Sequence, residues 1–208
     1  MRISKRVIPG DWFNGFIPDN VIIGQGAYIH STYHFAGFRS DRDPGLTLGE
    51  GANLNGAARM IVGPLGVVAI GDYSSINGTL ICAQSIEVGA HCMIAWGSMI
   101  TDCWPDETVS VSSRREAVVK SARTSERFPP LAVPPEPVVL EDSVWIGFGA
   151  VILPGVRVGR GSIVGCKTIL SKDVPPYTIV AGDPARSVGS LRPSDTAEAR
   201  RAALARAG

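Results

Sequence analysis

Three carboxylates lie in a short polar segment in the middle of the chain: Asp102, Asp106 and Glu107. A carboxylate can act as a general base when a dry site raises its pKa, because burial disfavours the charged form. These residue types could therefore serve as a general base that removes a proton from a substrate. Cys103 lies in the same segment, but it would act as a nucleophile only beside a group that stabilises its thiolate.

Histidine is the other candidate base, and the chain has three, His30, His34 and His91. His34 is the best of them for this role, because it lies in an aromatic and polar stretch, His-Ser-Thr-Tyr-His-Phe, that ends at residue 35. A hydrogen-bonded structural histidine is the competing interpretation of His34. His91 follows Gly89 and Ala90 at an expected corner of the chain, where we expect an exposed side chain.

Basic side chains that suit phosphate groups lie near the C-terminus, at Lys172 and Arg186, and in the middle segment, at Arg114 and Arg115. Solvated surface charges are the alternative interpretation of such residues. The four cysteines have no CxxC spacing and lie mostly among aliphatic residues; they are Cys82, Cys92, Cys103 and Cys166. We therefore expect buried thiols, with neither a disulfide framework nor a metal site.

The composition indicates a globular chain with one sizeable core: of 208 residues, 45% are hydrophobic and 19% charged. Basic and acidic residues nearly balance, at 20 and 19, and aromatic residues make up 7% without lying along a basic stripe. These values argue against a nucleic-acid partner. There is no long apolar run and no signal-like N-terminus, so we expect no membrane span and a cytoplasmic protein.

A six-residue period is the strongest signal in the sequence. Counting in sixes from Ile70 or from Leu140 gives only small or branched apolar residues: Ile70, Ile76, Cys82, Val88, Ile94 and Ile100, then Leu140, Ile146, Ile152, Val158, Val164 and Leu170. Neither a helix, with a period of 3.6, nor an ordinary strand, with a period of 2, fits this spacing. Short strands joined by tight corners fit it, with glycine at many corners and each strand hydrogen bonded to the next coil. The period predicts an all-β fold, a parallel β-solenoid.

The elements that would carry the candidate residues follow from where the period holds. An earlier, less regular block includes Ile23, Ile29 and Phe35. The middle segment leaves the period and is rich in proline; Ser113 and Glu116 form a capping-box pattern that predicts a short helix over residues 114–122. We expect one domain over residues 1–208, with irregular N-terminal coils at 1–69, regular coils at 70–100 and 139–181, an excursion loop at 101–138 and a C-terminal helix at 194–207.

The chain resembles the hexapeptide-repeat acyltransferases of the maltose, galactoside and sugar O-acetyltransferase type. The resemblance lies in the repeats, in the long loop between them and in residues 144–186, which read VWIGFGAVILPGVRVGRGSIVGCKTILSKDVPPYTIVAGDPAR. The similarity is close over residues 140–186, fair over 70–102 and weak before residue 70. It implies a left-handed parallel β-helix and a homotrimer. It also implies active sites between subunits, with acetyl-CoA or another acyl-CoA lying along the C-terminal coils.

The resemblance also implies roles for individual residues. Trp145 matches the aromatic residue beside the thioester, Phe148 and Cys166 match positions along the pantetheine arm, and Ser171, Lys172 and Arg186 match positions near the nucleotide phosphates. An aromatic cover on a solenoid face is the alternative for Trp145 and Phe148. Asn77 is a candidate for binding the acceptor, although asparagine is also common at solenoid corners.

The sequence departs from the family where the family's loop supplies a histidine as general base. Here the segment after Ile100 has no histidine, and Trp104 or Asp106 stands at that position. Asp102, Asp106, Glu107 or His34 could replace it, or the activity could be lost. We expect an acyl-CoA-dependent acyltransferase acting on a small molecule or sugar, with Arg114 and Arg115 contacting the acceptor or the CoA phosphates. The alternative is a diverged enzyme or a non-enzymatic binding or scaffold protein on the same fold.

Overall fold

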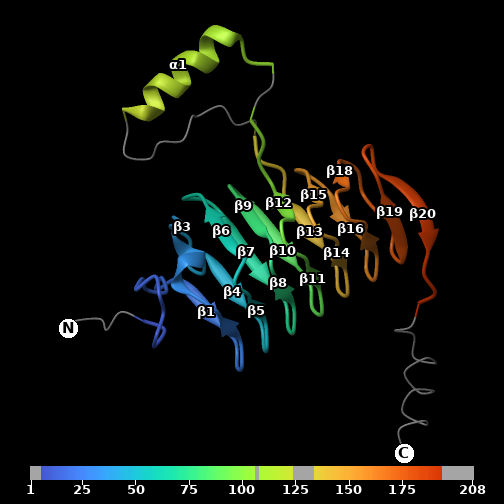
Figure 1. The fold of residues 1–208 in the computed structure, drawn as a ribbon, viewed down its shortest axis with the longest axis horizontal. Helices are drawn as coiled ribbons and strands as arrows, with labels where there is room; N and C mark the ends of the chain where they lie inside the picture. The colour runs from blue at the N-terminus through green and yellow to red at the C-terminus, as the bar shows by residue number, and fades with distance from the viewer. Residues whose placement is uncertain (1–5, 106–107, 124–133, 194–208) are drawn as a thin grey trace, which may run out of the picture.

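The computed structural model describes residues 6–105, 108–123 and 134–193. Its strands form three long parallel sheets around one axis, so that the chain winds as a three-sided coil (Figure 1). The predicted left-handed parallel β-helix is confirmed. Each strand pairs with its equivalents in the coils before and after it, which satisfies the backbone hydrogen bonds of these short strands.

The three sheets each take one strand from every coil. The first sheet contains β1 (Val21–Ile23), β4 (Leu46–Leu48), β7 (Val67–Ile70), β10 (Ser85–Val88), β13 (Val138–Leu140) and β16 (Arg157–Val158). The second contains β2 (Tyr28–Ile29), β5 (Asn53–Leu54), β8 (Ser75–Ile76), β11 (Met93–Ile94), β14 (Trp145–Ile146), β17 (Ile163–Val164), β19 (Thr178–Ala181) and β20 (Arg186–Ser190). The third contains β3 (Gly37–Phe38), β6 (Arg59–Val62), β9 (Thr79–Cys82), β12 (Met99–Thr101), β15 (Val151–Ile152) and β18 (Ile169–Leu170). Coil 1 is β1 to β3, coil 2 is β4 to β6, and so on to coil 6.

The core is a set of apolar ladders inside the coil. One ladder on the second sheet runs through Leu54 and then through four residues of the six-residue period, Ile76, Ile94, Ile146 and Val164; all five are buried. Side chains stacked one coil apart remove nearly all of their apolar surface from water, which is the main favourable contribution to folding. Strand β20 ends the stack by pairing antiparallel with β19.

The N-terminal coils are more regular than the sequence indicated, because β1 and β2 pair in parallel register with coil 2. Phe35 is the exception to the expected strand pattern. It lies in a 3-10 helix, η1 (Thr32–Phe35), and is buried there. Asp11 holds this turn, since its carboxylate accepts hydrogen bonds from Ser31 Oγ at 2.7 Å and from the Thr32 backbone N–H at 3.0 Å.

The excursion leaves the coil after β12 and returns at β13, and its helix α1 (Val111–Ala122) stands away from the coil stack (Figure 1). The predicted capping box is wrong. The helix begins three residues earlier, because Ser110 is the N-cap and accepts the Ser113 backbone N–H. The expected helix at 194–207 lies outside the described residues. No helix in the described part of the chain is long and apolar enough to cross a membrane.

Candidate functional site

One corner of coil 3 is shorter than its neighbours. We call the turn from the second to the third sheet the groove corner. Across this corner the inward side chains Leu54 and Met60 of coil 2 are six positions apart in the sequence, and so are Ile94 and Ile100 of coil 4. Between their coil 3 partners, Ile76 and Leu80, the separation is four residues. The corner of coil 3 is only Asn77 and Gly78, so it is recessed between the corners on either side.

Gly78 is required for this short turn. A Cβ at position 78 would lie 2.4 Å from Ser98 Oγ and 2.8 Å from the Ser98 carbonyl oxygen. Both Ser98 atoms are fixed by the packed corner of coil 4, so no larger residue fits. The recess is therefore built into the coil by a deletion of two residues and a glycine.

The recess forms an open pocket of about 580 Å³ at the groove corner, which we call the notch; it is lined by Asn55, Gly56, Ala57, Asn77 and Trp96. Trp96 projects from coil 4, with 59% of its surface exposed, and its Nε1 donates a 2.6 Å hydrogen bond to Asn77 Oδ1. The Asn55 amide is directed by its own bond to Ser75 Oγ at 2.9 Å. An aromatic wall with fixed amides suits a small polar molecule.

Two of the expected cofactor residues continue from the notch along the groove corner. Phe148 of coil 5 packs edge-on against Trp96, with ring centroids 5.9 Å apart, and Cys166 occupies the equivalent position in coil 6. The Lys167 backbone N–H donates to the Phe148 carbonyl oxygen at 2.7 Å, which joins these corners. The expectation of buried thiols is correct for Cys82 and Cys92. It is wrong for Cys166, which is exposed, and for Cys103, which is half-buried. Trp145 lies on the outer face of β14 and is 45% exposed.

The other expected cofactor residues converge at the C-terminal end of the coil. Ser171, Lys172 and Arg186 line a pocket of about 460 Å³ between the end of β18 and strands β19 and β20. Two cations in one pocket suit an anionic ligand such as a phosphate. In the described residues, no three His, Cys, Asp or Glu side chains are grouped so that they could hold a metal ion.

Asp102 is fully buried and has a structural role. Its carboxylate accepts the backbone N–H groups of Ala83, Gln84 and Ser85, each at 2.7 Å, and lies 3.4 Å from Cys82 Sγ. Burial and the adjacent carboxylate raise the pKa of Cys82. Because its oxygens are occupied by these donors and no solvent reaches them, we correct the interpretation of Asp102 as a base.

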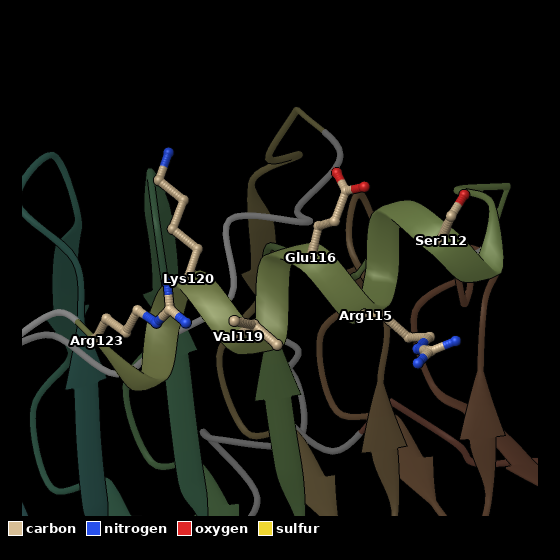
Figure 2. A pocket seen from close by; sticks show the side chains of 6 residues that line it. All are labelled: Ser112, Arg115, Glu116, Val119, Lys120 and Arg123. Atoms are coloured by element: carbon tan, nitrogen blue, oxygen red, sulfur yellow. The ribbon is translucent and has the colours of Figure 1, made fainter.

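The remaining candidates of the excursion are only partly described. Trp104 lies at the root of the excursion and is 41% exposed. Asp106 and Glu107 lie outside the described residues. Arg114 and Arg115 lie on α1, which stands away from the coil stack (Figure 1). A hollow along α1 is lined by five residues of this helix and by its C-cap, Arg123, and their side chains diverge instead of enclosing a ligand (Figure 2).

His34 lies in η1 with 1% of its surface exposed, which does not fit a base that must reach a substrate. Its Nδ1 donates to the Ala58 carbonyl oxygen at 2.6 Å, and its Nε2 is buried without a hydrogen-bond partner in the described structure. Burial lowers the pKa of His34, so the ring is held neutral. The structural interpretation of this histidine is the one that its geometry supports.

His30 was missed by the sequence analysis. It is exposed at the groove corner of coil 1, and a hydrogen bond of 3.1 Å joins its Nδ1 to Tyr28 Oη. A Cβ at Gly56 would lie 3.6 Å from His30 Nε2, so the ring borders the notch. Trp96 was also missed. Trp96 could have been found from the sequence, because it occupies in coil 4 the position that Phe148 occupies in coil 5 and Cys166 in coil 6. Both of those residues were among the expected cofactor residues.

Comparisons with known proteins agree with this architecture. Residues 137–172 match the model of the bacterial transferase hexapeptide (six repeats). The chain is 30% identical over 125 residues to a galactoside O-acetyltransferase of Lactococcus lactis subsp. lactis, covering 60% of this chain and 53% of that protein. It is 56% identical over 52 residues to a 2,3,4,5-tetrahydropyridine-2,6-dicarboxylate N-acetyltransferase of Staphylococcus aureus, covering 25% and 22%. The alignments span from about a fifth to about half of the length of these curated relatives.

Solved structures show the same coil. A hexapeptide-repeat acetyltransferase of Vibrio cholerae complexed with acetyl coenzyme A has a TM-score of 0.52 and 28% identity, with 72% of each chain covered. An N-acyltransferase of Bacillus cereus in complex with dTDP and 3-hydroxybutyryl-CoA has a TM-score of 0.60 and covers 91% of this chain and 89% of that one. Its 19% identity supports the fold alone. In its three-sided coil and six-residue period, and over the matched residues, the chain is similar to the hexapeptide-repeat acyltransferases.

Proposed function

We propose that this protein transfers an acyl group, in the simplest case acetyl, from acyl-CoA to a hydroxyl or amine of a small molecule or sugar. The observation that carries the proposal is the row of side chains on the groove corner, in which Cys166 and Phe148 lead to Trp96 and the notch. A cationic pocket with Lys172 and Arg186 lies at the C-terminal end of the same coil. A long ligand with an anionic end fits such a row, with its reactive end beside Trp96.

In the proposed reaction the acceptor lies in the notch. Its oxygen or nitrogen attacks the thioester carbonyl carbon, a new C–O or C–N bond forms, and the C–S bond breaks as the CoA thiolate leaves. The proton of the acceptor goes to a base, for which Asp106 and Glu107 are the remaining carboxylate candidates. Asn77 and Trp96 orient the acceptor through their fixed amide and aromatic face.

A sugar acceptor is supported by the galactoside O-acetyltransferase among the relatives. We further propose a homotrimer, because the notch and the corner are open on one side and a neighbouring subunit would cover them. Arg114 and Arg115 would then serve a site through the excursion of a neighbour. The proposal includes a cytoplasmic location, where acyl-CoA is available.

Binding and turnover test this function separately. We expect calorimetry to show acetyl-CoA binding to the wild type and weaker binding, by about tenfold, to Lys172→Ala and Arg186→Ala, since each loses one charged hydrogen bond. Arg42→Ala, an exposed arginine at the other end of the coil, is the matched control and should bind normally. No binding of acetyl-CoA at millimolar concentration to the wild type would refute the proposal.

A non-catalytic binding or scaffold protein on this coil is the second candidate, and one observation favours it. None of the three histidines lies in the excursion, where the family has its base. CoA binding without acyl transfer to any of a broad panel of sugars and amines would support this candidate. For the enzyme, Asp106→Asn and Glu107→Gln should be compared for kcat, and a loss of about 10²-fold or more in one of them would identify the base.

A further inference from the structure

His30 has the surroundings of a ligand-binding residue, unlike the other two histidines. His34 is buried, and His91 stacks flat on Tyr73, at 5.6 Å between ring centroids and 5° between planes, at a different corner of the coil. His30 is exposed at the groove corner, and its Nδ1 is fixed by Tyr28. A side chain held by one ring nitrogen has the other available for a ligand.

The way from the notch to His30 is open because the corner between them carries small residues. Coil 2 presents Gly56 and Ala57 here, and both line the notch. The Nε2 side of the His30 ring lies against Gly56, so a ligand that passes over this glycine meets that nitrogen. The other residues that line the notch carry no charge; they are Asn55, Asn77 and Trp96.

Distance separates His30 from the reacting atoms. Successive coils are about 4.8 Å apart, so His30 in coil 1 lies roughly 10 Å from Asn77 in coil 3. A base must lie within about 3 Å of the proton that it removes. His30 is therefore too far from a reaction at Trp96 and Asn77 to be the base, but it is at the right distance to contact the far end of a sugar-sized acceptor.

We propose that His30 binds an anionic group, such as a phosphate or carboxylate, at the end of the acceptor remote from the reacting hydroxyl or amine. This inference rests on the proposed acyltransferase function and specifies its acceptor. The imidazole supplies an N–H donor from Nε2 in the tautomer in which Nδ1 accepts the hydrogen bond from Tyr28 Oη. His30 is a specificity-determining residue in this proposal.

The test uses two acceptors that differ only in the remote group, glucosamine and glucosamine 6-phosphate, with acetyl-CoA as donor. In His30→Ala we expect the KM for glucosamine 6-phosphate to rise about tenfold or more, as for loss of a hydrogen bond to a charged group. The KM for glucosamine, the KM for acetyl-CoA and kcat should stay within about threefold. His30→Gln keeps an N–H donor and should recover part of the affinity, and His91→Ala is the matched control and should match the wild type.

Equal effects of His30→Ala on the two acceptors, or no effect on either, would overturn the inference while leaving the acyltransferase proposal intact. Absence of transfer by the wild type to both acceptors would count against the proposed reaction. In that case the ring signals of His30 in a ¹H–¹⁵N spectrum, assigned by their loss in His30→Ala, give an independent readout. A shift of these signals on addition of glucosamine 6-phosphate, and not of glucosamine, supports the inference, and their constancy overturns it.

Discussion

Trp96 Nε1 donates a hydrogen bond of 2.6 Å to Oδ1 of Asn77, so the indole of coil 4 is anchored over the recessed corner of coil 3. The bond uses the amide oxygen of Asn77 and leaves its NH₂ group available to a ligand. It also fixes the Trp96 ring against rotation, although 59% of the residue is exposed. The two residues together give the notch one rigid wall and one directed donor.

We therefore expect Trp96→Phe to lower kcat/KM for the acceptor by about three- to tenfold. Phenylalanine keeps an aromatic wall but loses the N–H, so Asn77 is free to rotate, and a hydrogen bond of this kind contributes about 1 kcal/mol. Steady-state kinetics with a saturating acyl donor measures the effect. Trp12→Phe changes an equally exposed tryptophan of the N-terminal segment and should have no effect; equal losses in both variants would contradict the role of the bond.

Asp102 leads to a prediction about stability. In Asp102→Asn, one carboxylate oxygen becomes an NH₂ group that faces the backbone N–H groups now bound by the acid. We expect a loss of about 3 kcal/mol in the free energy of unfolding, because buried donors are left without acceptors. Asp142→Asn is the control, since Asp142 is exposed and accepts only the Ala90 N–H in the described structure, at 2.9 Å. Urea unfolding of the two variants should differ clearly, and equal midpoints would refute the structural role.

His34 predicts a pH dependence of stability. Burial lowers its pKa in the folded protein below the ordinary value of 6.5, so the unfolded chain binds more protons as the pH falls through that value. The contribution of neutral His34 is thus fully present above about pH 6.5 and is lost progressively below it. Urea midpoints measured from pH 7.5 to 5.0 should fall for the wild type and fall less steeply for His34→Gln. His91→Gln should keep the wild-type slope, and parallel slopes for all three proteins would contradict the assignment.

The fold could be predicted because the coil repeats one physical requirement in each segment. Residues such as Ile76 and Ile94 must face the axis, and the six-residue spacing records this directly in the sequence. The notch could not be predicted by the same count. Strand β9 turns both Leu80 and Cys82 inward, so six residues after Ile76 the count still finds a buried side chain. The two-residue deletion is visible only when the pairing of Leu80 with Ile100 is known.

For the candidate site, Phe148 and Cys166 came from the family resemblance and Asn77 was a separate candidate for binding the acceptor; all three lie on the groove corner. His34 and Asp102 are buried, which does not fit a role as general base. Their burial depends on contacts between coils, such as that of His34 with Ala58, and no local sequence pattern shows such contacts. His30 and Trp96 have their neighbours in adjacent coils, Gly56 beside His30 and Asn77 and Phe148 beside Trp96, so their sequence surroundings gave no reason to prefer them.

The short corner itself can be tested by restoring its length. Insertion of Gly-Ser between Asn77 and Gly78 would lengthen the spacing from Ile76 to Leu80 from four positions to the six found from Leu54 to Met60 and from Ile94 to Ile100. The added residues would fill the notch, and the core ladders would stay in register because the insertion lies between inward positions. We expect kcat/KM for the acceptor to fall by about 10²-fold or more, since the acceptor loses its place beside the reacting group. Acetyl-CoA affinity and the melting temperature should change little. The same insertion between Pro64 and Leu65, in the turn between β6 and β7, is the control; if it impaired transfer equally, the effect would come from the coil and not from the notch.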